Sequence, residues 1–258
     1  NVSMTARTIR LPEGFYLHEL EAIDSTNDEA KRLADKGAQS GALVLARTQT
    51  SGRGRRGRAW SSPVGNLYSS LLLRPTCSLA EAARLTFLIA VSMAEAVEIV
   101  TGNQVRPDCK WPNDLMVNGR KICGILLESA SNQGSATDYL VIGTGVNVAF
   151  APDDAERPAT SLSALGAPVS VDELVSTYLA RIAHWLPIWE DKGFGPVREA
   201  WLSRGYGIGQ PVVARLTERE LSGTFVGLDD DGSLVLREDN GTEHRIGAGE
   251  VFFATGSE

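Results

Sequence analysis

Residues 52–58 read Gly-Arg-Gly-Arg-Arg-Gly-Arg, which places four arginines among three glycines in one short segment. The whole chain has a formal net charge of −7, so these cations are concentrated at one place. Glycines let the backbone approach a ligand closely, and guanidinium groups match the paired oxygens of carboxylates and phosphates. The segment therefore predicts an anion-binding loop. Because the four arginines repel one another, we expect the loop to become ordered only when a ligand binds.

Other interpretations of this run are weaker. Gly52, Gly54 and Gly57 satisfy the G-x-G-x-x-G pattern of dinucleotide sites, but Trp60-Ser61-Ser62-Pro63 follows where that motif opens a helix. The chain has no Gly-Lys-Ser/Thr sequence, which excludes a P-loop. Nucleic-acid binding is the more serious rival, although the acidic composition gives no broad basic surface. Small-anion binding, nucleic-acid binding and a merely solvated loop stay open at this point.

A second group of polar residues precedes a hairpin signal. Asn118-Gly119 is the strongest two-residue turn signal for a β-hairpin. Strict pairing from that turn puts Lys110 opposite Leu127 and places Lys110, Asp114 and Lys121 on one face. Two cations and a carboxylate would then converge, with Trp60 and Trp111 offering flat surfaces near the cations. The alternative is a solvated face with an ordinary surface ion pair, which contributes little stability.

The elements that must position these residues follow from periodicity, caps and turns. Strands are expected at 15–24, 42–48, 67–74, 109–117, 121–128 and 139–150. Capping-box spacing starts a short helix at Thr26, a long helix after Ser78 that ends near Val100, and a third helix after Ser170, with a fourth helix over 195–204. Pro112 cannot donate to a strand ladder, so it marks an edge or a break. Strand pairs alternating with long helical connections predict an α+β fold with a mixed, largely antiparallel sheet.

The composition changes beyond Gly205. Short β-rich runs at 212–216, 222–228, 233–238 and 243–246 are separated by turn clusters such as Asp239-Asn240-Gly241. That spacing fits a small barrel. We therefore divide the chain into a larger domain, 1–208, and a small C-terminal β domain, 209–258.

Length and composition exclude several classes of protein. A chain of 258 residues with 43% hydrophobic content can bury a sizeable core. Its longest apolar stretch is interrupted by Glu95 and Glu98, and no signal-peptide pattern is present, so we expect a cytoplasmic protein without a membrane span. The three cysteines lack C-x-x-C spacing and the three histidines are scattered, which argues against disulfides and a structural zinc site.

Together these segments resemble the ligand-binding motifs of the biotin protein ligase family. The matching segments, in the family's order and at similar separations, are Ser25-Thr26-Asn27, Gln49, residues 52–58 with Trp60, residues 110–115, Lys121 with residues 124–126, and residues 143–147. The resemblance covers most of the chain. It implies a catalytic domain related to class II aminoacyl-tRNA synthetases and lipoate ligases at 1–208, followed by an SH3-like domain at 209–258. Because only about a dozen residues precede the first strand, we expect no repressor function.

The family's reaction, which the resemblance implies for this chain, has two steps. The biotin carboxylate attacks the α-phosphate of ATP to give biotinyl-5′-AMP and pyrophosphate. A lysine amine on a biotin carboxyl carrier domain, such as that of acetyl-CoA carboxylase, then attacks the mixed anhydride and AMP leaves. Bringing two anions together is the main obstacle, and positioned cations are the main remedy.

The resemblance also implies a role for each matching residue. Arg53, Arg55, Lys110, Asp114 and Lys121 would be catalytic. Biotin would be bound by Ser25, Thr26, Asn27, Gln49, Arg53, Gly54, Arg55, Lys121 and Gly124, and ATP by Arg55, Arg58, Trp60, Lys110, Asn113, Asp114 and Asn147. Asp114 would either orient a lysine or act as base for the incoming amine, and both possibilities stay open.

The remaining expectations concern partners. Mg²⁺ is expected with ATP, although the sequence shows no side-chain cage for it. The acceptor would be the carrier-domain lysine, with no DNA and no membrane as partners, and the protein would be a monomer or a homodimer. The alternatives to a biotin ligase are a lipoate-type ligase or acyltransferase, and a non-catalytic protein that binds biotin or a nucleotide.

Overall fold

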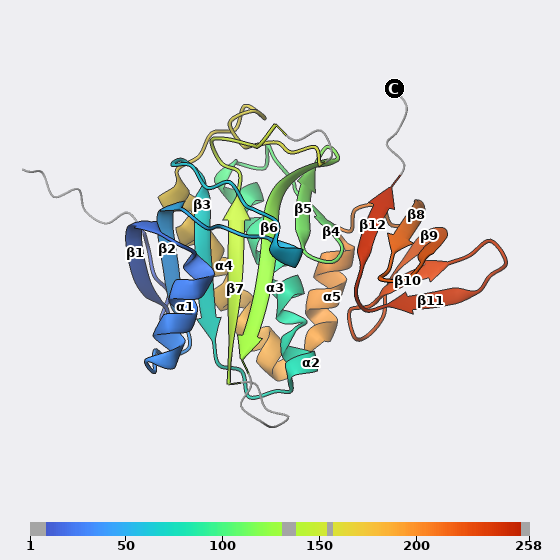
Figure 1. Cartoon of the computed structure of the whole chain (residues 1–258), viewed down its shortest axis with the longest axis horizontal. Coiled ribbons are helices and arrows are strands. Elements are labelled where there is room, and N and C mark those ends of the chain that lie inside the picture. The colour runs from blue at the N-terminus through green and yellow to red at the C-terminus, as the bar shows by residue number, and fades with distance from the viewer. Residues whose placement is uncertain (1–8, 131–137, 154–156, 254–258) are drawn as a thin grey trace, which may run out of the picture.

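The computed structural model describes residues 9–130, 138–153 and 157–253. Its larger part contains a seven-stranded sheet in the order β1-β2-β3-β7-β6-β5-β4 (Figure 1). The strands are β1 (Tyr16–Ile23), β2 (Ala42–Gln49), β3 (Leu67–Leu73), β4 (Asp108–Lys110), β5 (Asp114–Val117), β6 (Arg120–Ala130) and β7 (Tyr139–Val146). Only β1 and β2 pair in parallel, and the other neighbours are antiparallel. The predicted α+β class with a mixed, largely antiparallel sheet is therefore confirmed.

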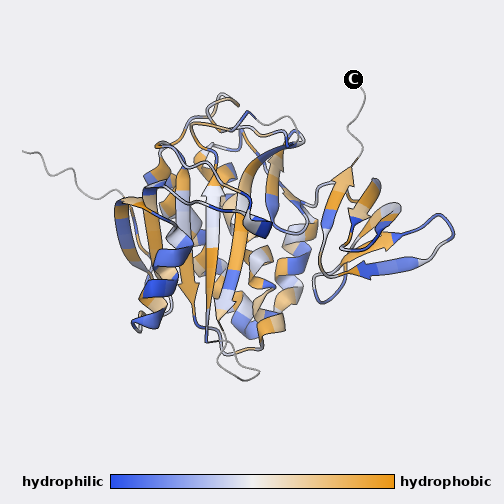
Figure 2. Ribbon diagram, viewed as in Figure 1, coloured by the Kyte–Doolittle hydropathy of each residue, from blue (hydrophilic) through white to orange (hydrophobic). Residues whose placement is uncertain are grey.

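Helices cover both faces of this sheet. Helix α1 (Thr26–Asp35) packs against β2, β3 and β7 on one face. Helices α3 (Leu85–Val100), α4 (Val171–Lys192) and α5 (Phe194–Leu202) pack together behind the other face (Figure 1). Figure 2 shows the resulting pattern, with apolar strands inside and a hydrophilic outer side on α1. Apolar side chains of α3 such as Leu88, Ile89 and Met93 are fully buried, so the predicted helical stripe is packing.

One predicted helix start needs correction. The Ser78 capping box is present, but it opens the four-residue helix α2 (Leu79–Ala82), and Ala83 and Arg84 separate α2 from α3. Hydrogen bonds over three residues, such as Thr86 N to Ala83 O, tighten the chain there and break the expected single helix. Helix α1 begins at Thr26 as predicted, and Ser25 is its cap, because the Ser25 hydroxyl accepts from the Asp28 amide.

The hairpin around Asn118-Gly119 also departs from strict pairing. Met116 pairs with Lys121, but Leu115 pairs with Cys123, so Ile122 is an extra, bulged residue. The chain turns at residues 111–113, and Lys110 therefore pairs with Asp114 rather than with Leu127. The expected continuous strand over 109–117 is thus two strands, β4 and β5. The break lies at Pro112, as its missing donor indicates.

The C-terminal part forms a separate five-stranded antiparallel sheet in the order β11-β10-β9-β8-β12. Its strands are β8 (Pro211–Arg215), β9 (Glu220–Leu228), β10 (Leu234–Arg237), β11 (Glu243–Ile246) and β12 (Glu250–Phe253). Strand β12 was not predicted from the sequence, because it is short and follows a glycine. Trp111 joins the two sheets, because its indole N–H donates to Gly232 O at 3.1 Å. The boundary at 208/209 stays a prediction.

In the described ranges, no helix is long and apolar enough to cross a bilayer.

Candidate functional site

A cavity of about 730 Å³ opens where α1, the arginine segment, β5, β6, β7 and β12 meet. Every residue predicted from the sequence to belong to the site lines it: Ser25, Thr26, Asn27, Gln49, Arg53, Gly54, Arg55, Arg58, Trp60, Lys110, Asn113, Asp114, Lys121, Gly124 and Asn147. These residues come from six separate segments of the chain. Their convergence is a finding of the structure, whereas the role of each one stays a prediction.

Part of the cavity lining is a hydrogen-bonded group of side chains, Thr26, Asn27 and Gln49, which we call the polar wall. The Thr26 amide and hydroxyl both contact Gln49 Oε1, at 2.9 and 3.1 Å, and Gln49 Nε2 donates to the Ser62 hydroxyl at 3.0 Å. The Ser70 hydroxyl lies 2.8 Å from Thr26 Oγ1 and 2.5 Å from Asn27 Oδ1. Ser70, Thr26 and Asn27 are buried. The wall therefore presents hydroxyl and amide groups whose directions are fixed by one another.

Two glycines on neighbouring strands also line the cavity. Gly124 on β6 and Gly145 on β7 are cross-strand partners, and the Trp60 ring lies across both. A Cβ atom on Gly145 would come within 2.7 Å of the indole, so a side chain there would displace Trp60. The Trp60 indole N–H is buried and has no hydrogen-bond partner within the described part of the chain.

Lys121 links the Trp60 ring to the hairpin. Its Nζ lies 2.9 Å from Asp114 Oδ1 and 5.3 Å from the centre of the Trp60 ring. Lys110 is the neighbouring cation, and burial lowers its pKa despite the nearby Asp114 carboxylate. The predicted convergence of Lys110, Asp114 and Lys121 is found, although the bulge and the turn at 111–113 produce it rather than a strict ladder.

The arginine segment is neutralised in part by the chain's own carboxylates. Arg53 Nη1 and Nη2 donate to Asp28 at 2.9 and 2.7 Å, and Nη2 also reaches Glu128 at 3.0 Å. Arg58 pairs with Glu250 of β12 at 2.7 Å, and Arg56 lies 3.7 Å from the same carboxylate. The repulsion expected among the four arginines is therefore offset for Arg53, Arg56 and Arg58 by these carboxylates. Ordering of the loop by a ligand stays a prediction.

Arg55 differs from its neighbours. Its nearest polar contact is Gly249 O at 3.5 Å, and burial lowers its pKa, with further repulsion from Arg56 and Arg58. Within the described ranges no carboxylate lies in hydrogen-bonding range of Arg55, and a desolvated guanidinium of this kind that lines a cavity is suited to bind an anionic ligand.

Other residues near the cavity were missed by sequence reasoning. Glu250, Arg157, Tyr206, Phe252 and Phe253 line it, and Asp28 and Glu128 lie behind its wall. Asp28 and Glu29 read from sequence as ordinary acidic residues of a first helical turn, and Glu128 as the end of a strand. The four arginines indicate that carboxylates from elsewhere in the chain must balance their charge, and this is the one signal in the sequence for Asp28 and Glu128.

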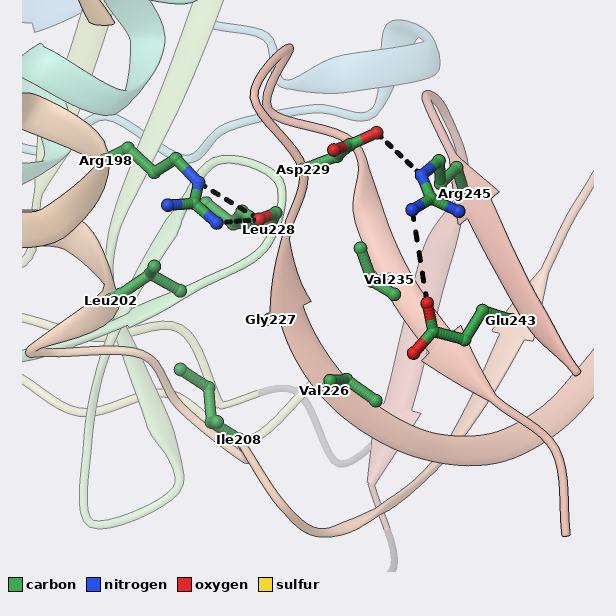
Figure 3. A pocket seen from close by; sticks show the side chains of 10 residues that line it. All are labelled: Arg198, Leu202, Ile208, Val226, Gly227, Leu228, Asp229, Val235, Glu243 and Arg245. Atoms are coloured by element: carbon green, nitrogen blue, oxygen red, sulfur yellow. Dashed lines mark hydrogen bonds and ion pairs between the residues drawn. The ribbon is translucent and has the colours of Figure 1, made fainter. Parts of the chain in front are cut away.

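Trp111 lines the cavity, but only 2% of it is exposed. Its main contact is with the C-terminal sheet. A second hollow of about 490 Å³ lies between α5 and that sheet (Figure 3). There Arg198 donates to Leu228 O and Arg245 pairs with Asp229 at 2.8 Å, so both arginines are engaged. The Arg198 contact links α5 to the C-terminal sheet, whereas the Arg245 pair lies within the C-terminal part.

The comparisons with known proteins agree with this geometry. Residues 19–147 match the model of the Biotin/lipoate A/B protein ligase family, and residues 207–254 match the Biotin protein ligase C terminal domain. A biotin--[acetyl-CoA-carboxylase] ligase of Paracoccus denitrificans is 41% identical over 240 residues, which span 91% of this chain and 99% of the relative. The chain belongs to the biotin protein ligase family.

Other biotin protein ligases show the same extent of similarity. The bifunctional ligase/repressor BirA of Bacillus subtilis is 35% identical over 234 residues, covering 88% of this chain and 71% of BirA. The structure of a biotin protein ligase from Aquifex aeolicus in complex with biotin and ATP matches with a TM-score of 0.79 and 30% identity, over 92% of this chain and 99% of that one. The similarity therefore extends over both sheets.

Proposed function

We propose that the chain is an ATP-dependent biotin ligase that forms biotinyl-5′-AMP and transfers biotin to a lysine of a biotin carboxyl carrier domain. The observation that carries this proposal is one cavity lined both by the polar wall and by the cations Arg55, Lys110 and Lys121. Such a cavity suits a ligand that carries both an uncharged polar ring and an anionic group.

The polar wall suits the ureido ring of biotin. That ring has two N–H donors and one carbonyl acceptor, and hydroxyl and amide groups can match both kinds. In this proposal Ser25, Thr26, Asn27 and Gln49 contact the ring, and Gly54 and Gly124 allow close approach of the ligand. A site built from fixed polar groups discriminates strongly against analogues that leave those groups unpaired.

The cations would act on the first step. A carboxylate oxygen of biotin attacks the α-phosphorus of ATP, the bond to the bridging oxygen breaks, and pyrophosphate leaves with the electron pair. Arg53, Arg55 and Lys121 would lie at the junction of the carboxylate and the α-phosphate, with Lys110 and Arg58 toward the other phosphates. Each charge-assisted contact contributes roughly 1.5–3 kcal/mol. Trp60 and Asn147 would contact the adenine or the ribose.

In the second step the acceptor amine attacks the acyl carbon, and AMP leaves. Asp114 contacts Lys121 at 2.9 Å, which supports the role of orienting that lysine. The role of base for the incoming amine is its rival. Asp114→Asn separates the two, because loss of orientation slows both steps, whereas loss of a base slows only transfer.

Mg²⁺ would arrive with ATP. The carboxylates that line the cavity are Asp114 and Glu250, and the described residues contain no cluster of three potential metal ligands. The phosphates would therefore supply most of the ligands, with Asn113 and Asp114 near them. We place the protein in the cytoplasm as a monomer or homodimer, and its net charge of −7 disfavours DNA as a partner.

The test is a mass measurement. The chain is incubated with ATP, Mg²⁺, an apo carrier domain and either biotin or lipoate, and the carrier is weighed. A carrier that gains the mass of biotin, and gains no mass when lipoate is supplied, supports the proposal. Addition of lipoate would indicate the lipoate-type ligase, and an unmodified carrier under all conditions would leave a binding protein without turnover.

A further inference from the structure

The Glu128 carboxylate lies behind the polar wall and contacts three groups at once. Its Oε2 accepts from Asn27 Nδ2 at 2.7 Å and from Arg53 Nη2 at 3.0 Å. Its Oε1 lies 3.1 Å from Lys31 Nζ, and a quarter of the side chain is exposed. Glu128 does not itself line the cavity, so any effect on a ligand must pass through Asn27 or Arg53.

The first consequence is the orientation of the Asn27 amide. A carboxylate can only accept, so Nδ2 faces Glu128, and Oδ1 faces the Ser70 hydroxyl at 2.5 Å. Gly143 makes room for this amide, since a Cβ atom there would come within 2.3 Å of Asn27 Oδ1. A reversed amide would set its oxygen against the Glu128 carboxylate and against Leu126 O, which Nδ2 approaches at 3.4 Å.

The second consequence follows from counting hydrogens. Ser70 has one hydroxyl hydrogen, and Asn27 Oδ1 has none, so the Ser70 hydrogen is committed to Asn27. In the 2.8 Å contact between Ser70 and Thr26, the hydrogen must then come from Thr26, unless Thr26 donates to Gln49 Oε1 at 3.1 Å. In both cases the Thr26 oxygen accepts no hydrogen from Ser70, so its lone pairs stay available in the cavity that Thr26 lines. With a reversed Asn27 amide, Ser70 would accept from Nδ2 and donate its own hydrogen to Thr26, which would occupy one of those lone pairs.

We propose that Glu128 is a positioning residue that makes Thr26 a hydrogen-bond acceptor for a ureido N–H of biotin. This inference rests on the proposed function. It assigns Glu128 a selective effect on biotin rather than on ATP, because the ordered chain Glu128-Asn27-Ser70-Thr26 ends at the polar wall. Glu128 also contacts Arg53, but Asp28 holds Arg53 at 2.7 Å as well, so the loss of Glu128 leaves that arginine paired.

The test compares two substitutions of Glu128 with a matched control. Glu128→Leu removes the acceptor, and Glu128→Gln keeps one oxygen that can accept from Asn27. The control is Glu19→Gln, because Arg47 is held between Glu19 and Asp172 much as Arg53 is held between Asp28 and Glu128, with similar exposure. Neither Glu19 nor Asp172 lines the cavity.

The readouts are the KM for biotin and for ATP in biotin-dependent pyrophosphate exchange, with the thermal midpoint of each variant. We expect Glu128→Leu to raise the KM for biotin about tenfold or more, with the KM for ATP changed less than twofold. Glu128→Gln should recover part of that loss, and Glu19→Gln should change neither KM. In a double-mutant cycle, Thr26→Val and Glu128→Leu should be strongly non-additive.

Equal rises in both KM values, an unchanged KM for biotin, additive effects in the cycle, or the same effect from Glu19→Gln would each overturn the positioning role. Failure of the proposed function has a different signature. It would show as a wild-type chain that carries out no biotin-dependent exchange at all.

Discussion

Arg53 and Arg55 are two residues apart, yet substitution of Arg53 should lower the stability of the ligand-free protein, whereas substitution of Arg55 should lower activity without lowering stability. Arg53 donates four contacts to Asp28 and Glu128, at 2.7 to 3.1 Å, and 27% of its side chain is exposed. Its loss would leave two carboxylates with weaker compensation. Allowing for solvent screening and for Lys31, Arg53→Gln should lower the free energy of unfolding by about 1–2 kcal/mol.

Arg55 has no such partner, and burial lowers its pKa, so folding disfavours its charged form. Arg55→Gln should therefore leave the stability of the ligand-free protein unchanged or slightly higher. If Arg55 makes one charge-assisted contact with substrate, pyrophosphate exchange should fall about 10- to 150-fold.

The assays are thermal unfolding without ligands and biotin-dependent exchange. For a chain of this size Arg53→Gln should lower Tm by about 2–8 °C, whereas Arg55→Gln should not lower it. The control is Arg237→Gln, whose partner Glu243 also lies on the C-terminal sheet away from the cavity, and it should alter neither quantity. A loss of stability in Arg55→Gln equal to that in Arg53→Gln, or exchange within twofold of wild type, would refute the division between a structural and a ligand-facing arginine.

Three further outcomes can be measured. Gly145→Ala should displace the Trp60 ring and slow adenylation, because its Cβ atom would lie 2.7 Å from the indole, whereas Gly195→Ala in α5 has free space and should stabilise the protein by about 0.5–1 kcal/mol without loss of activity. Contacts with Arg53 lower the pKa of Asp28, and the pKa of Glu128 is also lowered, because contacts from Asn27, Lys31 and Arg53 outweigh burial. Both carboxylates therefore stabilise the fold fully at pH values above their ordinary pKa values of 3.8 and 4.5. The free energy of unfolding should decline as pH falls through the lowered values, and a Glu128→Gln variant that declines as steeply as wild type would contradict this. Iodoacetamide should modify Cys77 alone in the native protein, since burial raises the pKa of Cys109 to about 12 and that of Cys123 further, and rapid labelling of either buried thiol before unfolding would contradict their packing.

Local signals in the sequence were enough to predict most elements. The cap after Ser170, the turn at Asn118-Gly119 and the break at Pro112 are decided by neighbouring residues, and each is found in the structure. The bulge at Ile122 and the missed strand β12 depend on how distant strands pack. Their positions could not be read from periodicity, which assumes a regular ladder.

The members of the site were predictable, but their partners were not. Arg53 was recognised from its segment, whereas Asp28 is 25 residues away in sequence and Glu128 is 75 residues away. Only the neighbouring positions of α1 and β6 bring these two carboxylates together. The same holds for Glu250, which pairs with Arg58 because β12, the edge strand of the C-terminal sheet, lies beside the cavity.

These partners change the electrostatic argument for the site. Four unpaired arginines would make the ligand-free segment costly to fold, and carboxylates from α1, β6 and β12 offset that cost for Arg53, Arg56 and Arg58. A substrate anion that binds one of these arginines must compete with its internal partner, so its affinity is reduced by the free energy of the pair that it replaces. Arg55 and Lys110 have no ion pair with any carboxylate of residues 9–130, 138–153 and 157–253, and burial lowers the pKa of both. The largest net gain from binding the biotin carboxylate and the nucleotide phosphates is therefore expected at these two side chains, rather than evenly along the arginine segment.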